Sequence, residues 1–261
     1  MNKLFLTILL SLVSPLIFAQ DKHDYKVTVV AFYNLENFYD TINNTMVNDE
    51  EFLPAGEKNY STQIYFNKVG KLAKVISEIG TEYTPDGPAI LGVAEIVNDT
   101  VLTDLVQHPL IKSRDYHFVH YDSRDIRGID VGFLYNPKYF TVIDSRKLFV
   151  RLPADAKESI FTRDVLWVKG LLNGETVHVF VNHWPSRLGG EERSEPGREA
   201  AAQVNRNMID SINKAEPNAK FIVMGDLNDD PINNSITHVL GAKGELEKVQ
   251  PGGLYNPWYN M

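Results

Sequence analysis

Residues 220–231 read KFIVMGDLNDDP, and this stretch decides the fold class. The apolar run at residues 220–224 predicts a buried strand, which Gly225 and Asp226 end with a polar loop. Directly before it, residues 198–212 predict a helix with an apolar stripe of Ala200, Ala201, Val204, Met208 and Ile212. A helix that leads into a buried strand is typical of an α/β protein.

The same alternation continues upstream of this stretch and predicts one α/β domain. Helices are expected before Gly80, where apolar residues recur at helical spacing, and at residues 99–107. Strands are expected at residues 27–33, 89–96, 116–121, 129–135, 140–144, 165–172 and 176–182. Asn173 and Gly174 form a two-residue hairpin signal between the last two, so part of the sheet is antiparallel. This mixture predicts two mixed sheets packed face to face, with helices outside.

Composition limits the chemistry. The chain has 261 residues, a formal net charge of −8 and no cysteine. Without cysteine there is no disulfide, no thiolate metal site and no cysteine nucleophile, so any metal is held by oxygen or imidazole ligands. The negative charge argues against a protein that coats nucleic acid through a broad basic face, because that affinity comes from lysine and arginine. A hydrolase that contacts a few phosphates remains compatible.

The first residues, MNKLFLTILLSLVSPLIFAQ, have the form of a secretory signal. Lys3 precedes an apolar run that Pro15 interrupts and that is short for a membrane span. We expect residues 1–19 to be a signal peptide cleaved after Ala19, leaving no stable membrane insertion; a retained anchor is the alternative. The domain then covers residues 25–261, and the protein is expected to be exported, to a bacterial periplasm or the extracellular space.

Polar side chains follow three of the apolar strands, at the point where each strand ends. Asn34 and Glu36 follow the first strand, and continued extended backbone would aim both side chains to the same side. Glu95 closes AILGVAE, and Asp226 and Asn228 follow FIVM with one residue between them. Carboxylate and amide oxygens are the hard ligands that Mg²⁺ and its waters prefer. Because ligands of open sheets collect at strand ends, these residues form a candidate metal site.

His183 ends a fourth strand, VHVFVNH, and Pro185 then forces the chain out of the sheet. A histidine near a phosphate can donate a hydrogen bond to a phosphoryl oxygen or move a proton. Arg187 and Arg163 carry forked donors that phosphate oxygens accept, which makes both candidate phosphate ligands. Taken singly, Asn34, Glu95 and Asp226 are more often a turn residue, an ion-pair partner or a helix entry, so only the complete set indicates a site.

Six segments together carry a resemblance to a known family. In chain order they are FYNLENF, GVAEI, RGIDVGFLYN, FTRD, VNHWPSRLGG and VMGDLNDDP. This ordered set resembles the endonuclease/exonuclease/phosphatase superfamily, which includes pancreatic deoxyribonuclease, abasic-site endonucleases, inositol-polyphosphate phosphatases and sphingomyelinases. The resemblance implies a four-layer αββα sandwich of two mixed β-sheets.

The resemblance also implies a metal-dependent phosphoesterase site. Glu95 matches the principal ligand of Mg²⁺, with Glu36 and Asn34 beside it, and Mn²⁺ can take the place of Mg²⁺. The expected function is that of an exported phosphoric ester hydrolase, either a nuclease or another phosphodiesterase. Its expected partner is a phosphate-ester substrate, with nucleic acid among the candidates, and we infer no obligate protein partner.

Catalytic roles follow from the same resemblance. Asp226 matches the residue that orients the nucleophile, while Asn228 and His183 match groups that hydrogen-bond the phosphoryl oxygens. Arg163 matches a phosphate or nucleic-acid contact of the deoxyribonuclease branch.

One family feature has no counterpart here. The family's last strand carries a Ser-Asp-His signature whose histidine completes the site, whereas this sequence ends in GLYNPWYNM. We therefore expect the domain to be C-terminally incomplete, with its last strands missing. Two alternatives stay open: a noncatalytic module of the same fold that binds phosphate or polyanions, and a phosphatase of lipids or inositol phosphates.

Overall fold

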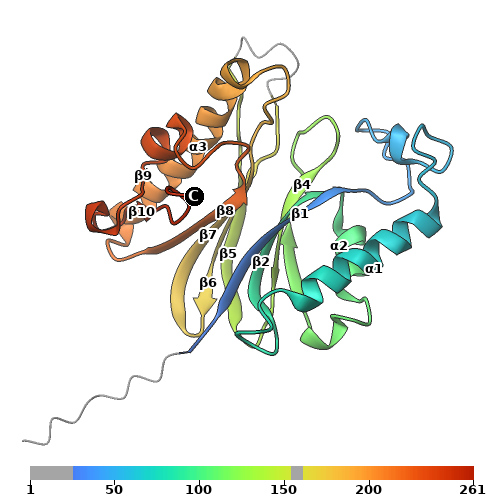
Figure 1. Ribbon diagram of the computed structural model, residues 1–261, viewed down its shortest axis with the longest axis horizontal. Helices are drawn as coiled ribbons and strands as arrows, with labels where there is room; N and C mark the ends of the chain where they lie inside the picture. The colour runs from blue at the N-terminus through green and yellow to red at the C-terminus, as the bar shows by residue number, and fades with distance from the viewer. Residues whose placement is uncertain (1–25, 154–160) are drawn as a thin grey trace, which may run out of the picture.

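The computed structural model describes residues 26–153 and 161–261, whose longer strands form two four-stranded mixed sheets (Figure 1). The first sheet has the order β1-β2-β4-β3, with β1 (Val29–Phe38), β2 (Pro88–Ile96), β3 (His117–His120) and β4 (Asp130–Tyr135). The second has the order β5-β6-β7-β8, with β5 (Phe140–Leu148), β6 (Val165–Leu172), β7 (Glu175–His183) and β8 (Lys220–Asp226). The pairs β1·β2 and β7·β8 are parallel and the others antiparallel, as the sequence predicts for mixed sheets.

Helices cover the outer faces of both sheets. Helices α1 (Thr62–Glu78) and α2 (Asp99–Val106) lie outside the first sheet, and α3 (Glu191–Ala215) lies outside the second (Figure 1). The smaller elements are β9 (Ala242–Lys243), β10 (Leu254–Tyr255), 3-10 turns at Glu50–Phe52, Lys112–Arg114 and Leu246–Lys248, and a π-helical turn at Ser235–Val239. The layers follow the order helix, sheet, sheet, helix, which confirms the predicted αββα sandwich.

The period of two along each strand divides its apolar side chains between two layers. On β2, Ile90 and Ala94 enter the core between the sheets, while Leu91 and Val93 enter the core beneath α1 and α2. Phe180 of β7 packs in a third core, beneath α3. Strands buried on both faces explain the nearly continuous apolar runs of the sequence.

Two glycines permit close approaches that shape the centre of the molecule. A Cβ on Gly92 would lie 2.6 Å from Met224 Sδ, so the two sheets approach closely at this point. Gly225 has a φ of +153°, and a Cβ there would lie 2.3 Å from the carbonyl oxygen of Asn182. Glycine is therefore required immediately before Asp226.

Helix α3 begins at Glu191 rather than at residue 198, and Pro196 lies inside it. Side chains hold its first turns: Ser194 Oγ donates to the carbonyl oxygen of Gly190, and Arg198 Nη2 donates to that of Glu191 at 3.0 Å. These local contacts offset the helix-breaking tendency of proline.

The predicted signal peptide, residues 1–19, lies outside the described residues and stays a prediction. Among the helices of the described ranges, none combines the length and apolar character needed to cross a membrane.

The imidazole of His120, at the end of β3, links two carboxylates and so ties β3 to α2 and β4. Its Nδ1 lies 2.8 Å from Asp99 Oδ1, its Nε2 lies 3.4 Å from Asp130 Oδ2, and 3% of its side chain is exposed. Burial alone lowers the pKa of His120, but the hydrogen bonds and charges of Asp130 and Asp99 outweigh burial and raise this pKa above its ordinary value. The folded protein therefore keeps this proton to a higher pH than the unfolded chain does.

We expect this ion-pair network to stabilise the protein fully below about pH 6.5, the ordinary pKa of histidine. The contribution is lost as the pH rises through the raised pKa of the folded state. His120→Gln should therefore lower the free energy of unfolding more at about pH 5 than at about pH 9. Urea denaturation at both pH values measures this, with His117→Gln, an exposed histidine of the same strand, as the control. Equal destabilisation by His120→Gln at both pH values would contradict the prediction.

Candidate active site

Irregular pairing at the ends of β1 and β2 builds the floor of the site. The ladder between β2 and β4 skips Glu95, which is the extra residue of a β-bulge and has a φ of +61°. The ladder between β1 and β2 skips residues 35–37, where Glu36 and Asn37 have φ values of +53° and +55°. Left-handed backbone costs a non-glycine residue about 1–2 kcal/mol. Strain of this kind collects at functional sites, where surrounding contacts hold it in place.

The bulges place the Glu95 carboxylate among donors from β1. The backbone N–H of Asn37 donates to Oε2 at 2.7 Å, and Asn34 Nδ2 donates to Oε1 at 3.1 Å. His183 Nε2 lies 3.6 Å from Oε1, and 16% of the Glu95 side chain is exposed. Asn37 acts through its backbone, so no residue type at this position could have signalled the contact in the sequence.

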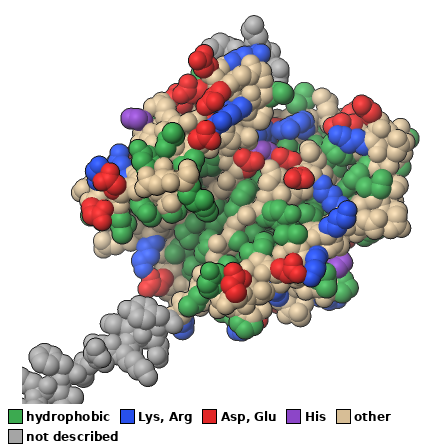
Figure 2. All heavy atoms as spheres, in the orientation of Figure 1, with side chains coloured by type: hydrophobic (Ala, Val, Ile, Leu, Met, Phe, Trp, Pro, Cys, Tyr) green, Lys and Arg blue, Asp and Glu red, His purple; other side chains and the backbone are tan. Residues whose placement is uncertain are grey.

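The amide of Asn34 also joins the two sheets. Its Nδ2 donates to Asp226 Oδ2 at 3.0 Å, in addition to its bond with Glu95. Asp226 ends β8 in the second sheet, and its Oδ1 accepts from the backbone N–H of Asn228 at 3.1 Å. The structure thus brings Asn34, Glu95, His183 and Asp226 together from four strands, and Figure 2 shows acidic side chains and a histidine gathered at the centre of this face.

Glu36 lies differently from the sequence-based expectation. The extended backbone that this expectation required does not continue, because the backbone turns left-handed at Glu36. The side chain of Glu36 is exposed, and the residue makes its hydrogen bonds through the backbone, from its N–H to Asn34 Oδ1 at 2.8 Å and from Lys68 Nζ to its carbonyl oxygen. A role of the Glu36 carboxylate as metal ligand stays a prediction.

His183 is a neutral imidazole in this environment. Its residue is 5% exposed, and burial, with the nearby positive charges of Arg163 and Arg127, lowers the pKa of His183 to about 2. Nδ1 is buried and has no hydrogen-bond partner among the described residues. A neutral imidazole carries one N–H donor, and this N–H can donate a hydrogen bond to an anionic oxygen.

A buried polar network fixes the strand exit that carries His183. Asn182, which is fully buried, accepts hydrogen bonds at Oδ1 from Trp184 Nε1 at 2.9 Å and from Asn205 Nδ2 at 2.8 Å. Its Nδ2 donates to the carbonyl oxygen of Met224 at 3.2 Å. The network joins β7, β8 and α3, so His183 sits on a rigid support.

The carbonyl oxygen of Trp184 accepts hydrogen bonds from two residues that the sequence predicts at the site. Asn228 Nδ2 donates to it at 3.0 Å, and Arg163 Nη2 donates at 2.6 Å. The Arg163 side chain is buried and pairs with Asp125 Oδ2 at 3.1 Å, so the structure places this arginine beneath the site rather than open to a phosphate. Arg127, whose Nε lies 3.3 Å from Asp125 Oδ1 and whose side chain is 46% exposed, is the more accessible arginine of the pair. Local patterns in the sequence do not reveal Arg127, because only the fold brings the neighbouring Asp125 into contact with Arg163.

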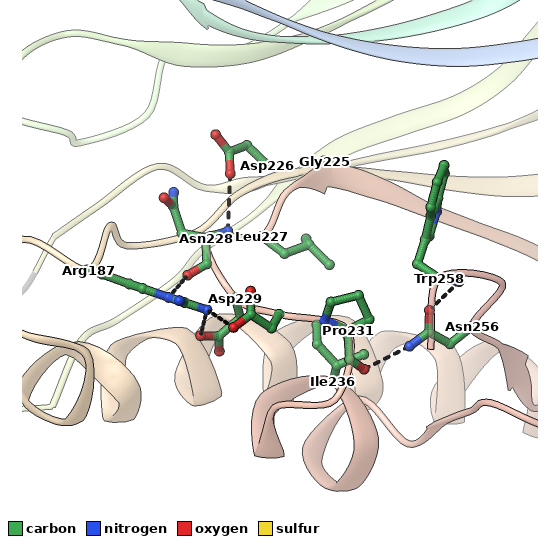
Figure 3. Close-up of a pocket in the computed structure, with 11 residues that line it drawn as sticks. Arg187, Gly225, Asp226, Leu227, Asn228, Asp229, Pro231, Ile236, Asn256 and Trp258 are labelled. Atoms are coloured by element: carbon green, nitrogen blue, oxygen red, sulfur yellow. Dashed lines mark hydrogen bonds and ion pairs between the residues drawn. The ribbon is translucent and has the colours of Figure 1, made fainter. Parts of the chain in front are cut away.

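Arg187 holds the loop that follows β8. Its Nε donates to the carbonyl oxygen of Asn228 at 3.0 Å, and its Nη2 lies 3.5 Å from Asp229 Oδ1 and 3.2 Å from Asp230 Oδ2 (Figure 3). Its donors are thus engaged within the protein, and a direct contact with substrate phosphate stays a prediction.

Asp229 anchors the same loop to α3. Arg198 Nε lies 2.6 Å from Asp229 Oδ1, and the two side chains are 0% and 1% exposed. Ser235 Oγ donates to Asp229 Oδ2 at 2.5 Å, and Asn233 Nδ2 donates to Oδ1 at 2.9 Å. This buried network positions Asp226 and Asn228, which precede Asp229 directly.

Two cavities flank the cluster formed by Asn34, Glu95, His183 and Asp226. The Trp258 cavity, of about 530 Å³, is lined by residues 225–231 with Arg187, Ile236, Asn256 and Trp258. Figure 3 shows Trp258 at one end of this cavity and Asp226 and Asn228 at the other. The Lys71 cavity lies between β1 and α1, also has a volume of about 530 Å³, and includes Asn34 in its lining. The Asn34 to Asp226 hydrogen bond joins the linings of the two cavities.

A further group of possible metal ligands shares no residue with this cluster. His120, Asp122 and Asp130 present ligand atoms within 4.8 Å of one another. Both ring nitrogens of His120 already contact carboxylates, so the group is an ion-pair network as it stands.

Comparison with known proteins places the chain in a family. The profile of the Endonuclease/Exonuclease/phosphatase family matches residues 29–261. The chain belongs to this family. Members of the endonuclease/exonuclease/phosphatase family hydrolyse phosphate esters and depend on divalent metal ions. No curated protein sequence matches the chain significantly.

Solved structures share the family fold. An endonuclease/exonuclease/phosphatase family protein from Bacteroides thetaiotaomicron is 15% identical, with a TM-score of 0.54 over 81% of this chain and 65% of that one. A mannosyl-6-phosphatase from Bacteroides thetaiotaomicron VPI-5482 is 16% identical, with a TM-score of 0.54 over 82% and 70%. ANGEL2, a 2′,3′-cyclic phosphatase, is 12% identical, with a TM-score of 0.53 over 80% and 55%. The chain therefore spans 55–70% of the length of these structures.

The central cluster fits a divalent cation, the cofactor of this family. Glu95 and Asp226 converge on one amide, and within residues 26–153 and 161–261 no lysine or arginine forms an ion pair with either carboxylate. Two partly buried carboxylates without a cationic partner are costly to desolvate, and a bound divalent ion would offset that cost.

Proposed function

We propose that this protein is an exported, Mg²⁺-dependent phosphoesterase of the nuclease or phosphodiesterase type. The observation that carries the proposal is the convergence of Glu95 and Asp226, from different sheets, on the amide of Asn34 beside a neutral histidine. The match of residues 29–261 to a family of phosphate-ester hydrolases supports the same conclusion.

Glu95 would hold the metal ion, with the amide of Asn34 adjacent to it. When bound, Mg²⁺ supplies a Lewis acid that stabilises negative charge on a phosphoryl oxygen. Asn34 Nδ2 now donates to both carboxylates, and this shared bond sets the spacing between the metal ligand and Asp226. The bulges at Glu36 and Glu95 determine the positions of these side chains.

Asp226 would orient the attacking water and accept its proton. Its Oδ1 is fixed by the backbone N–H of Asn228, so the carboxylate is held in one orientation. Asn228 uses one amide hydrogen on the carbonyl oxygen of Trp184, and the second remains for a phosphoryl oxygen. His183 would donate its single N–H to another phosphoryl oxygen, since burial keeps the imidazole neutral.

Removing the metal should abolish hydrolysis. The full chain, supplied with Mg²⁺ or Mn²⁺, is assayed on duplex DNA, RNA, a sphingolipid and inositol phosphates, and EDTA is then added. We expect turnover of at least one phosphate ester and a fall of about 10³-fold on chelation, because a metal ion contributes several kcal/mol to transition-state stabilisation. Restored turnover after excess Mg²⁺ is the control. Turnover that EDTA leaves unchanged would contradict the proposal, and polyanion binding without any product would favour the noncatalytic alternative.

A further inference from the structure

The Lys71 cavity presents hydrogen-bond donors that the cluster does not use. Asn34 forms its end next to the cluster, and Asn67, Lys68 and Lys71 line it from α1, with Tyr60 from the preceding loop. Figure 2 shows lysine and arginine side chains on this part of the surface, next to the central acidic side chains. The cavity is continuous with the site through Asn34.

Three of these side chains have donors to spare. The side chain of Lys71 forms no ion pair or hydrogen bond with any described residue. Asn67 Oδ1 accepts from Gln63 Nε2 at 3.1 Å, which leaves the Asn67 amide hydrogens available. Tyr60 is 7% exposed, yet its hydroxyl is buried without a partner among the described residues. A buried hydroxyl without a partner is rare in folded proteins.

Lys68 places a second positive charge on the same wall. Its Nζ donates to the carbonyl oxygens of Glu36 and Asn37, which fixes the ammonium group beside the bulge of β1. Glu36 is the single acidic residue in the lining, against two lysines.

The two cavities differ in the sign of their charge. The Trp258 cavity is lined by one arginine and three aspartates, Asp226, Asp229 and Asp230. The Lys71 cavity therefore attracts anions, whereas the Trp258 cavity repels them. A substrate whose cleaved phosphate lies at the cluster can therefore place a further anionic group in the Lys71 cavity more favourably than in the Trp258 cavity.

We propose that the Lys71 cavity binds a second phosphate group of the substrate, adjacent to the one that is cleaved. Lys71 and the Asn67 amide would bind its oxygens. This inference rests on the proposed phosphoesterase function. It makes the preferred substrate a phosphate ester with at least two neighbouring phosphates, rather than a monoester or diester with neutral flanks.

The test compares dinucleotides that differ by one phosphate. Hydrolysis of TpT is measured with Mg²⁺ against TpT that carries a terminal phosphate at the 5′ or the 3′ end. We expect the wild-type protein to favour one phosphorylated form about tenfold in kcat/KM, mainly through KM, as one charge-assisted hydrogen bond predicts. Lys71→Ala should remove this preference, so that kcat/KM for the favoured phosphorylated form falls to about that for TpT. Lys74→Ala, an exposed lysine on the same helix that pairs with Glu78, should change neither rate.

Two outcomes overturn the proposal: no preference for a terminal phosphate in the wild type, or the same loss on all three substrates in Lys71→Ala. A failure of the phosphoesterase function is separable from both. If the wild type hydrolyses none of the three, binding of inorganic pyrophosphate without metal is measured by calorimetry. Binding that weakens about tenfold in Lys71→Ala and stays unchanged in Lys74→Ala supports the subsite. Equal binding by wild type and Lys71→Ala rejects it.

Discussion

Glu95→Gln is expected to lower metal-dependent hydrolysis about 10³-fold or more while leaving the protein folded. Gln keeps the size of the side chain but removes the negative charge that would hold the metal ion. The backbone N–H of Asn37 can still donate to the remaining oxygen, so the β-bulge keeps one of its contacts. Loss of one of two close carboxylates also relieves their mutual repulsion, since Glu95 and Asp226 share the amide of Asn34.

Activity and Mn²⁺ affinity are measured together in this experiment. We expect calorimetry to show weaker Mn²⁺ binding by Glu95→Gln, and thermal melting to show a folded protein. Glu78→Gln makes the same substitution at an exposed position of α1 and should leave rate and metal affinity unchanged. Full activity in Glu95→Gln, or lost activity with unchanged Mn²⁺ affinity, would contradict the assignment of Glu95 as metal ligand.

Arg198→Met should lower the free energy of unfolding by about 3–5 kcal/mol, the cost of breaking a buried ion pair. The substitution leaves the Asp229 carboxylate buried without its closest cation, because Arg198 Nε lies 2.6 Å from Asp229 Oδ1 while Arg187 Nη2 lies at 3.5 Å. Chemical denaturation measures the loss.

The exposed Arg193 of the same helix provides the matched control. Arg193→Met should change the free energy of unfolding by no more than about 0.5 kcal/mol. The double variant Arg198→Met with Asp229→Leu removes both charges and should recover part of the loss. A cost below about 1 kcal/mol for Arg198→Met would show that the remaining hydrogen bonds of Asp229 suffice without the arginine.

Much of the fold follows from the sequence because periodicity survives in buried elements. The runs around Glu95 and Asp226 predict buried strands, and the Asn173-Gly174 turn fixes an antiparallel pair; both are present in the structure. The prediction for α3 began after Pro196, because local propensity places a helix start there. Side-chain contacts of the first turns, which local patterns do not reveal, extend the helix to Glu191.

The sequence predicts which residues form the candidate site better than it predicts their backbone conformation and burial. Polar residues at strand ends mark Asn34, Glu95 and Asp226, since such residues rarely follow apolar runs without a reason. The left-handed turn at Glu36 lies where the pairing between β1 and β2 is irregular, so the rule for extended strands does not apply there. The burial of Arg163 likewise depends on Asp125, which only tertiary structure brings into contact.

The two sheets come from consecutive stretches of chain, since the first ends at Tyr135 and the second begins at Phe140. Each half supplies two members of the cluster: Asn34 and Glu95 from the first, His183 and Asp226 from the second. Neither half holds a complete set, so the chemistry exists only when the halves dock. Activity therefore reports on the docking of the two sheets, and a side chain at position 92 that displaces Met224 should lower it.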